Sequence, residues 1–382
     1  MRDLTRAGLQ VVGVDCEPEH EGFRSVYGES RLCPNPDHQP DAWVAFMIAL
    51  ARELGARPVI IPAADIFVTA LGRHAQALAP HYIFSMESIA VQARLATKDQ
   101  QYALAAAANL PIPRTVAVTC LAEVEAYLAT VRFPCLMKPH HQREWEQLPA
   151  GNPLRRVKLV TAENAEEMLD WYAHTSSLRP EVVLQEIVAG GDDAKYCYLS
   201  VYGQNSRRLG YCVVRELRAH PIGFGSASVV EPVVDEEIAT ICDTFLRRVG
   251  YVGICEIEVK RDVRDHGVRL IEANPRYSVT ADAAPYAGVP IGLLHYQSLL
   301  GQEGAEQTTT RFGFRHVALR RELAAVHQYT ERGISTWVDL WDSYQTPLEF
   351  FDFDLEDPRP TWSTVNLGLR AFLRNTLKSF GL

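Results

Sequence analysis

Residues 250–276 read GYVGICEIEVKRDVRDHGVRLIEANPR, and this stretch decides the fold. Two apolar runs, 253–259 and 268–273, flank a charged turn that contains glycine. Apolar runs joined by such a turn are typical of a β-hairpin. Because successive side chains of a strand point to opposite faces, Glu256 and Glu258 are expected to share one face of the first strand.

The second strand carries its own pair of polar side chains, because Glu272 and Asn274 are also two residues apart. The hairpin therefore predicts that carboxylate and amide oxygens from two strands meet at one place. Mg²⁺ prefers such ligands and usually takes one or two carboxylates together with substrate phosphates. Arg276 adds a permanent cation beside them, which suits phosphoryl transfer. Taken alone, the pattern fits equally well an edge hairpin whose acids face solvent.

The composition is that of a globular protein. The chain has 382 residues, of which 47% are hydrophobic and 22% charged, and this length predicts roughly two to three domains. A net charge of −9 argues against a nucleic-acid partner. No apolar run approaches the ~20 residues of a membrane span. The eight cysteines form no CxxC pair, so we interpret them as buried, reduced thiols and expect a cytoplasmic protein.

The N-terminal region predicts a small α/β domain. Its pattern indicates strands at 9–14 and 58–62 and a helix at 41–54. Asp65 follows the second strand, at the end where open α/β sheets bind ligands. There is no GxGxxG motif, so nothing indicates a dinucleotide. Residues 1–7 look like the end of a helix, and we expect the first strand of this domain to be missing.

Two lysines are candidates for binding phosphate groups. Lys98 lies in the middle of a helix expected at 88–110, and Lys138 is the last residue of a buried strand expected at 133–138. A rigid strand end can hold an ammonium group against a phosphate. Taken alone, a lysine that extends from a strand end into solvent is the more common case. The polar loop 140–156 is long for a connection, which is typical of a lid.

A further strand pattern, 182–188, leads into two glycines followed by Asp192 and Asp193. A strand, a glycine turn and an acid suit a hinge over a nucleotide, where backbone groups meet the base and a carboxylate accepts the ribose hydroxyls. In isolation, a plain strand and turn is the more common case. The small-residue loop 223–228 leaves backbone N–H groups open to an anion, although this signal is weak by itself.

The C-terminal part forms an extension from residue 311 onward. Its last segment, 363–382, has an apolar face and a basic face at helical spacing. Such a segment can lie on an anionic membrane surface. We favour a terminal helix packed on the core, so that membrane contact is the lesser alternative.

The separate signals occur in one order: Lys98, Lys138, the hinge at 185–193, an arginine and small-residue loop, Glu258, and ExNPR at 272–276. This order resembles the ATP-grasp superfamily. The nearest subgroup is the carbamoyl-phosphate-synthase-like ATP-grasp ligases, near D-aspartate ligase and related carboxylate–amine ligases. The segments DIFVTAL, TKDQQYALAAAANLPIPRT and ADAAPYAGVP also resemble their family counterparts.

The resemblance spans about residues 10–300 and implies an α/β (α+β) class, an ATP-grasp fold in three parts. A small Rossmann-like pre-ATP-grasp domain is expected at 1–92, and a C-terminal extension at 306–382. The ATP-grasp domain would lie between them at 93–305, with a lid subdomain at about 133–190.

The resemblance also implies roles for individual residues. Three lysines would bind the ATP phosphates, the last of them from the lid on a strand at 157–160: Lys98, Lys138 and Lys158. The hinge would bound the adenine pocket and supply one acid to the ribose: Gln185, Glu186, Ile187 and Val188, then Asp192 or Asp193. One or two Mg²⁺ ions would be held by three ligands, with Glu256 the less favoured candidate: Glu258, Glu272 and Asn274. Two arginines would contact the γ-phosphate and the acyl phosphate: Arg276 and Arg218.

The activity that the resemblance implies is ATP-dependent carboxylate–amine ligation through an acyl phosphate, with release of ADP and phosphate. ATP and Mg²⁺ would be required, with Mn²⁺ as an alternative ion. The partners would be small carboxylates and amines, and a homodimer is left open. Two alternatives remain: an ATP-grasp enzyme with another acceptor, either carboxyphosphate-forming or kinase-like, and a non-catalytic nucleotide-binding subunit.

Overall fold

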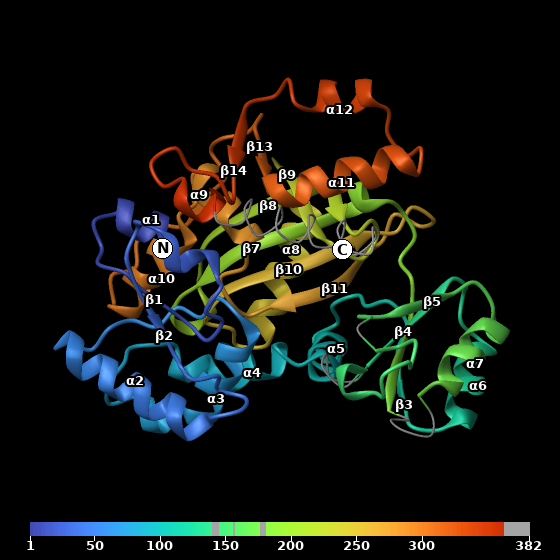
Figure 1. Cartoon of the computed structure of the whole chain (residues 1–382), viewed down its shortest axis with the longest axis horizontal. Coiled ribbons are helices and arrows are strands. Elements are labelled where there is room, and N and C mark those ends of the chain that lie inside the picture. The colour runs from blue at the N-terminus through green and yellow to red at the C-terminus, as the bar shows by residue number, and fades with distance from the viewer. Residues whose placement is uncertain (140–144, 156, 176–180, 363–382) are drawn as a thin grey trace, which may run out of the picture.

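The computed structural model describes residues 1–139, 145–155, 157–175 and 181–362, without the side chains of Lys98, Asp99 and Gln147. Within these residues the chain forms three β-sheets (Figure 1). A large central sheet lies between a small N-terminal region and a four-stranded sheet, which are its two flanking units (Figure 1). The predicted helical segment within 363–382 lies outside the described residues.

The N-terminal region packs helices on a short parallel strand pair. Its elements are α1 (Arg2–Arg6), β1 (Val12–Asp15), β2 (Glu29–Leu32), α2 (Pro40–Leu54) and α3 (Asp65–Leu78). Trp43, Leu71 and Leu78 are buried where α2 and α3 meet. The strand expected at 58–62 forms only an isolated bridge, Val59 to Ile83, so that prediction was wrong in extent.

The single helix expected at 88–110 is two helices, α4 (Ile89–Leu95) and α5 (Lys98–Ala107). Thr97 interrupts them with extended backbone angles, φ −111° and ψ 121°. Its hydroxyl donates to the carbonyl of Ala93 at 3.1 Å, a local bond by which threonine competes with helix continuation. The backbone of Lys98 therefore begins a helix, and is not in the middle of one as expected.

The four-stranded sheet has the order β3–β6–β4–β5. Its strands are β3 (Thr115–Val118), β4 (Cys135–Pro139), β5 (Val160–Ala162) and β6 (Val182–Glu186), and its helices are α6 (Leu121–Leu128) and α7 (Ala165–Ala173). Met137 and Leu184 are buried against α7 residue Met168. Because side chains alternate, Lys138 and Gln185 are directed to the opposite face of the sheet.

The central sheet has the strand order β11–β10–β7–β8–β9–β13–β14, and β12 pairs with β8. Its strands are β7 (Lys195–Tyr202), β8 (Arg208–His220), β9 (Ser226–Val233), β10 (Gly253–Arg261), β11 (Val268–Asn274), β12 (Gln307–Thr308), β13 (Arg315–Val317) and β14 (Leu348–Phe350). Residues beyond 311 thus extend this sheet through β13 and β14.

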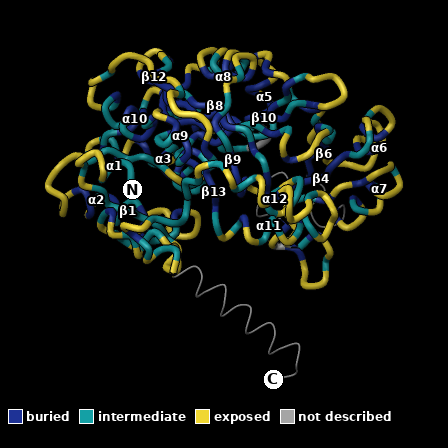
Figure 2. The backbone as a smooth tube through the Cα atoms, turned by 90° about the horizontal axis from the view of Figure 1, so that it is seen from above, coloured by how far each residue is buried: buried dark blue, intermediate teal, exposed yellow. Residues whose placement is uncertain are grey.

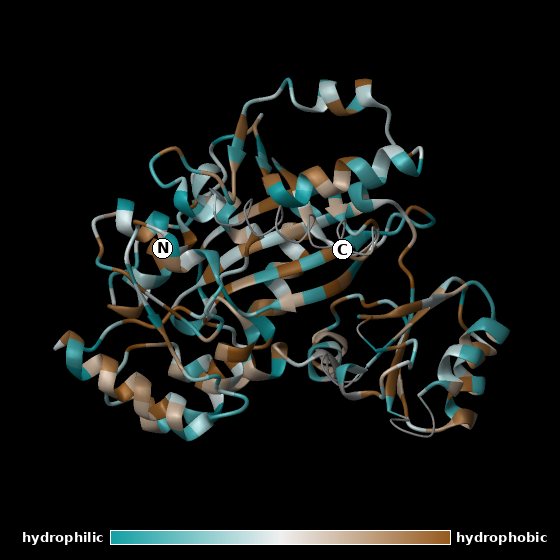
Figure 3. Cartoon of the chain, in the orientation of Figure 1, coloured by the Kyte–Doolittle hydropathy of each residue, from teal (hydrophilic) through white to brown (hydrophobic). Residues whose placement is uncertain are grey.

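The two faces of the central sheet differ. Cys255, Ile257 and Val259 pack with α5 and α8 (Glu236–Arg248) in one hydrophobic cluster. Ile254, two residues before Glu256, packs on the other side with α9 (Ala283–Tyr286) and α10 (Ile291–Leu299). The central strands are largely buried in Figure 2, and β10 and β11 show alternating hydrophobic and hydrophilic bands in Figure 3. The second face is therefore apolar at one end and charged at the other.

The remaining helices are α11 (Leu319–Glu331) and α12 (Trp337–Ser343). Helix α11 packs against β8 and β9. Six of the eight cysteines are buried, as predicted: Cys33, Cys135, Cys197, Cys212, Cys242 and Cys255. The prediction was wrong for the other two, because Cys16 is half-buried and Cys120 is exposed. None of the helices in the described residues is both long and apolar enough to cross a membrane.

Candidate nucleotide and metal site

The predicted hairpin is confirmed, and its register brings the polar side chains together. In the antiparallel pair of β10 and β11, Glu256 lies opposite Asn274 and Glu258 lies opposite Glu272. A register shift follows Glu258, because Val259 pairs with Leu270 and so skips Ile271.

This β-bulge lets β11 bury two core residues and still keep its polar side chains beside the glutamates. Leu270 and Ala273 are both buried in the same hydrophobic cluster although they are three residues apart. The extra residue, Ile271, changes the alternation between them, so that Glu272 and Asn274 remain beside the glutamates of β10. A regular strand could not satisfy the core and the polar face together.

Asn274 is the centre of the polar contacts. Its Nδ2 donates to Glu256 Oε2 at 3.2 Å and to Glu258 Oε1 at 3.3 Å. Its Oδ1 accepts from Arg276 Nη2 at 3.1 Å. Arg276 also donates to both carboxylate oxygens of Asp65, at 2.7 and 3.2 Å, and Asp65 is the first residue of α3. The N-terminal region therefore holds Arg276 in place.

The surroundings of Glu256 and Glu258 do not fully compensate the negative charge of these two carboxylates. Glu256 is only 2% exposed, and its Oε1 is buried without a hydrogen bond among the described residues. Burial raises the pKa of Glu258 well above its usual range, and the neighbouring Glu256 and Glu272 raise it further. A cation placed among these oxygens would remove the repulsion.

The donor set fits a hard divalent cation. No group of three or more His, Cys, Asp or Glu in the described part of the chain is arranged to hold a metal ion by itself. Mg²⁺ does not need such a group, because it usually takes one or two carboxylates plus phosphate oxygens. Glu258, Glu272 and Asn274 supply suitable oxygens once the Asn274 amide is turned over, since its Nδ2 now faces the glutamates.

Lys138 connects the four-stranded sheet with the hairpin. It is 8% exposed, and its Nζ donates to Gln185 Oε1 at 3.1 Å. The ammonium group lies 4.8 Å from the ring centre of Tyr102, whose hydroxyl donates to the carbonyl of Ile271 at 2.7 Å. Tyr102 on α5 thus contacts both the lysine and the bulge beside the glutamates.

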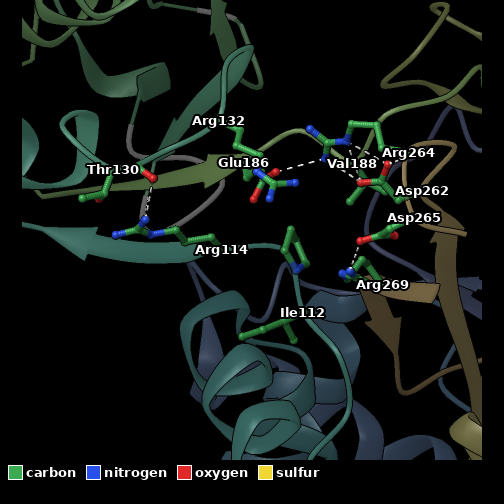
Figure 4. Close-up of a pocket in the computed structure, with 11 residues that line it drawn as sticks. Ile112, Arg114, Thr130, Arg132, Glu186, Val188, Asp262, Arg264, Asp265 and Arg269 are labelled. Atoms are coloured by element: carbon green, nitrogen blue, oxygen red, sulfur yellow. Dashed lines mark hydrogen bonds and ion pairs between the residues drawn. The ribbon is translucent and has the colours of Figure 1, made fainter. Parts of the chain in front are cut away.

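The side chains of the hinge residues face two different environments. Gln185 shares a face with Lys138, and its Nε2 donates to Thr115 Oγ1 at 2.7 Å. Glu186 and Val188 instead line a polar pocket of about 400 Å³ on the other side (Figure 4). This pocket also contains four arginines: Arg114 and Arg132, which precede β3 and β4, Arg264 in the hairpin turn, and Arg269 on β11.

Internal ion pairs occupy much of that pocket. Arg264 Nη2 is 3.0 Å from Glu186 Oε1 and is also paired with Asp262 (Figure 4). Arg269 pairs with Asp265 at 2.8 Å. An adenine base could therefore meet the backbone of the hinge more readily than the Glu186 side chain.

Asp192 and Asp193 have different environments. Asp192 is 5% exposed and lies 3.0 Å from Lys195 Nζ. Burial would raise its pKa, but Lys195 and the hydrogen bond from Tyr329 lower it overall. Asp193 has a side chain that is 62% exposed and pairs with Arg215 at 3.0 Å. Of the two, Asp193 is the more accessible to a ribose.

Three further predicted residues lie apart from the hairpin or are not placed. Arg218 is buried on β8 and pairs with Glu322 of α11 at 2.6 Å. Lys158 is exposed and precedes β5, so the strand expected at 157–160 was wrong and begins at Val160. The side chain of Lys98 lies outside the described side chains.

Sequence reasoning missed three charged residues near the glutamates. Glu216 on β8 lies 2.5 Å from Lys195 Nζ on β7, and Lys260 Nζ donates to the carbonyl of Gly190 at 2.6 Å. Lys260 continues the alternation that begins at Glu256, so the sequence pattern could have found it. The other two lie on β7 and β8, and the sequence does not show that these strands follow β10 in the sheet.

Glu216 should make stability depend on pH. Burial raises its pKa from 4.5 to about 7, although Lys195 opposes the shift. Between these pH values the folded protein keeps a proton that the unfolded chain releases, so stability falls as the pH rises through this window. In metal-free protein, Glu216→Gln should remove a loss of up to roughly 3 kcal/mol between pH 4.5 and 7.

Denaturant unfolding at several pH values measures this effect. Glu231→Gln on the neighbouring strand β9 is the control, and its pH profile should follow that of the wild type. If Glu216→Gln and the wild type lose stability in parallel between pH 5 and pH 8, Glu216 does not titrate as described.

No family model matches the chain. D-aspartate ligase from Enterococcus faecium is 24% identical over 257 residues, which are 64% of this chain and 60% of that ligase. The carbamoyl phosphate synthase large chain from Methanothrix thermoacetophila is 26% identical over 198 residues, 50% of this chain and 17% of the relative.

Solved structures show the fold. The biotin carboxylase domain of Hydrogenobacter thermophilus 2-oxoglutarate carboxylase has a TM-score of 0.59 at 15% identity, over 82% of this chain and 69% of that domain. L-amino acid ligase from Bacillus licheniformis has a TM-score of 0.55 at 14% identity, over 78% and 70%. The chain therefore has the ATP-grasp fold, and both the predicted fold class and the predicted resemblance are confirmed.

Proposed function

We propose that this protein is an ATP-dependent carboxylate–amine ligase. The observation that carries the proposal is the arrangement on β10 and β11, where Glu258, Glu272 and Asn274 lie together and Asn274 contacts Arg276. Lys138 reaches the same hairpin through Tyr102. In an ATP-grasp fold, oxygen ligands beside a lysine and an arginine suit the transfer of a phosphoryl group.

The names of two similar proteins support the choice of reaction. One is a D-aspartate ligase and the other an L-amino acid ligase, and both names describe joining an amino acid to another molecule. The chain spans only 60% of the length of the first, so the activity and the substrates are inferred from chemistry as well.

The proposed reaction has two steps. A carboxylate oxygen of the acid attacks the γ-phosphorus of ATP, ADP leaves, and an acyl phosphate forms. An amine then attacks the acyl carbon, the C–O bond to phosphate breaks, and the amide, phosphate and a proton are released. Neither step needs a nucleophile from the protein, so the chain contributes positioning and electrostatic stabilisation.

Each named residue has one task in this reaction. Mg²⁺, held by Glu258, Glu272 and Asn274, would neutralise phosphate charge when bound. Lys138 lies on the four-stranded sheet, and its ammonium group binds phosphate oxygens of ATP. Arg276, held by Asp65, is directed to the carboxyl phosphate.

Several finer expectations belong to the same proposal. They are the cytoplasmic location, the Mg²⁺ requirement, the homodimer and the division of the chain near residues 92 and 305. A neighbour in fold was solved as a dimer of biotin carboxylase domains with MgADP and bicarbonate, which supports the metal and the dimer. It also keeps bicarbonate as an alternative acceptor.

A phosphate-release screen tests the proposal. The purified protein is given MgATP with carboxylic acids and amines singly and in pairs, and with bicarbonate. We expect one acid–amine pair to release phosphate faster than either component alone. Release that needs bicarbonate or a hydroxyl acceptor supports the alternative enzymes, and binding of ATP without any turnover supports a non-catalytic subunit.

A further inference from the structure

Helix α11 lies against the strands that carry part of the site. It packs on β8 and β9, and two of the residues singled out by the sequence contact it directly. These are Arg218, which pairs with Glu322, and Asp192, which accepts a hydrogen bond from Tyr329. A segment outside the resemblance to known ligases therefore touches two predicted site residues.

The contact at Arg218 is a buried network. Glu322 is 3% exposed and Arg218 is 6% exposed. Glu322 Oε1 lies 2.6 Å from both Nε and Nη2 of the guanidinium. The second oxygen, Oε2, accepts from Ser228 Oγ at 2.7 Å, and the hydroxyl of Tyr344 donates to Oε1. Glu322 is thus fixed by two hydroxyl groups while it holds the arginine.

The contact at Asp192 has the same character. Tyr329 donates its hydroxyl to Asp192 Oδ2 at 2.5 Å. The backbone N–H of Gly223 donates to the same carboxylate at 3.1 Å, and Lys195 completes the contacts. Through Tyr329, α11 is tied to the turn that follows the hinge.

The guanidinium of Arg218, which lies 5.3 Å from the ring centre of Tyr344, has one nitrogen outside this pair. Glu322 contacts the Nε and Nη2 side of the guanidinium, and among the described residues no hydrogen bond to Nη1 is found. An arginine side chain loses rotamer entropy when it is fixed. Because Glu322 already fixes Arg218, the binding of a phosphate would require no further loss of this entropy.

We propose that α11 belongs to the site and that Glu322 is a positioning residue, which orients Arg218 toward the phosphoryl group being transferred. The inference rests on the proposed function and on the role that the sequence predicts for Arg218, which is to contact that group. Glu322 itself touches neither substrate nor nucleotide. Its role requires that its removal affects binding of the transferring group more than binding of the nucleotide.

The test compares two probes by calorimetry: MgADP alone, and MgADP with aluminium fluoride, which imitates a phosphoryl group in transfer. Glu322→Gln should bind MgADP within about twofold of the wild type. It should bind the fluoride complex about tenfold more weakly, a difference of ~1.4 kcal/mol. Glu331→Gln, an exposed glutamate on the same helix, is the matched control and should change neither affinity.

Circular dichroism establishes whether each variant is folded. If Glu322→Gln does not fold, Glu322→Asp keeps the charge but shortens the reach, and the same selective loss is expected. Equal losses with and without fluoride, no loss at all, or wild-type binding that fluoride does not tighten would overturn the inference. If the wild type does not bind MgADP, the proposed function fails as well.

Discussion

Replacement of Glu272 by glutamine is expected to lower MgATP turnover by about 10²- to 10³-fold, the effect of removing one group that stabilises transition-state charge. Glu272 lies directly opposite Glu258 in the register of the hairpin, and Asn274 lies two residues further along. Glutamine has almost the same shape but no charge, so it should not hold Mg²⁺ as a carboxylate does. Asn274→Ala should have a similar effect, because it removes the amide that contacts both glutamates of β10.

The control lies in the same hairpin. Asp265 is an exposed carboxylate at its turn, where it pairs with Arg269. Asp265→Asn should keep turnover within about twofold of the wild type, since surface ion pairs contribute little. Circular dichroism and thermal unfolding should show that all three variants are folded. Full activity of Glu272→Gln would remove this residue from the metal site.

Replacement of Lys138 by alanine is expected to weaken ATP binding by roughly 30-fold or more. Removing one partner of a buried, hydrogen-bonded charge pair costs about 2–5 kcal/mol in comparable complexes. Lys138 is suited to such a role because it is buried, held by Gln185 and placed against Tyr102. Calorimetry with MgATP measures the change directly.

Two further variants show whether a loss of affinity comes from the charge of Lys138 at this position. Arg52→Ala removes an exposed cation from α2 and should leave the affinity unchanged. Lys138→Met retains most of the side-chain volume, so its affinity separates the loss of charge from the loss of packing. An affinity for ATP that is the same in Lys138→Ala and the wild type would exclude the lysine from the nucleotide site.

Periodicity and turn chemistry predicted most of the elements around the site. The hairpin, the helix at Pro40–Leu54 and the strand that ends near Lys138 all occur close to their expected positions. These segments combine a strong alternation or helical spacing with clear end signals, and local sequence determines them.

The sequence could not predict what tertiary contacts decide. The bulge at Ile271 follows from the need to bury Leu270 and Ala273 together, which depends on α5 and α8 packing on the sheet. The helix break at Thr97 is a choice between two local hydrogen-bond patterns. Side-chain periodicity alone does not distinguish either case from the regular alternative.

Pairings between distant segments were equally hidden. Arg276 is held by Asp65, 211 residues earlier, and Arg218 by Glu322, 104 residues later. The sequence pattern predicted both arginines as site residues but did not indicate their carboxylate partners. Such pairs depend on how the N-terminal region and α11 pack on the central sheet, so only the fold discloses them.

Transfer of oxygen from substrate to phosphate tests the central claim most directly. The acid identified by the phosphate-release screen is labelled with ¹⁸O in its carboxylate and incubated with MgATP and its amine partner. The proposed acyl phosphate predicts that each phosphate released carries one labelled oxygen, which mass spectrometry detects. Unlabelled phosphate, released while amide forms, would contradict the account.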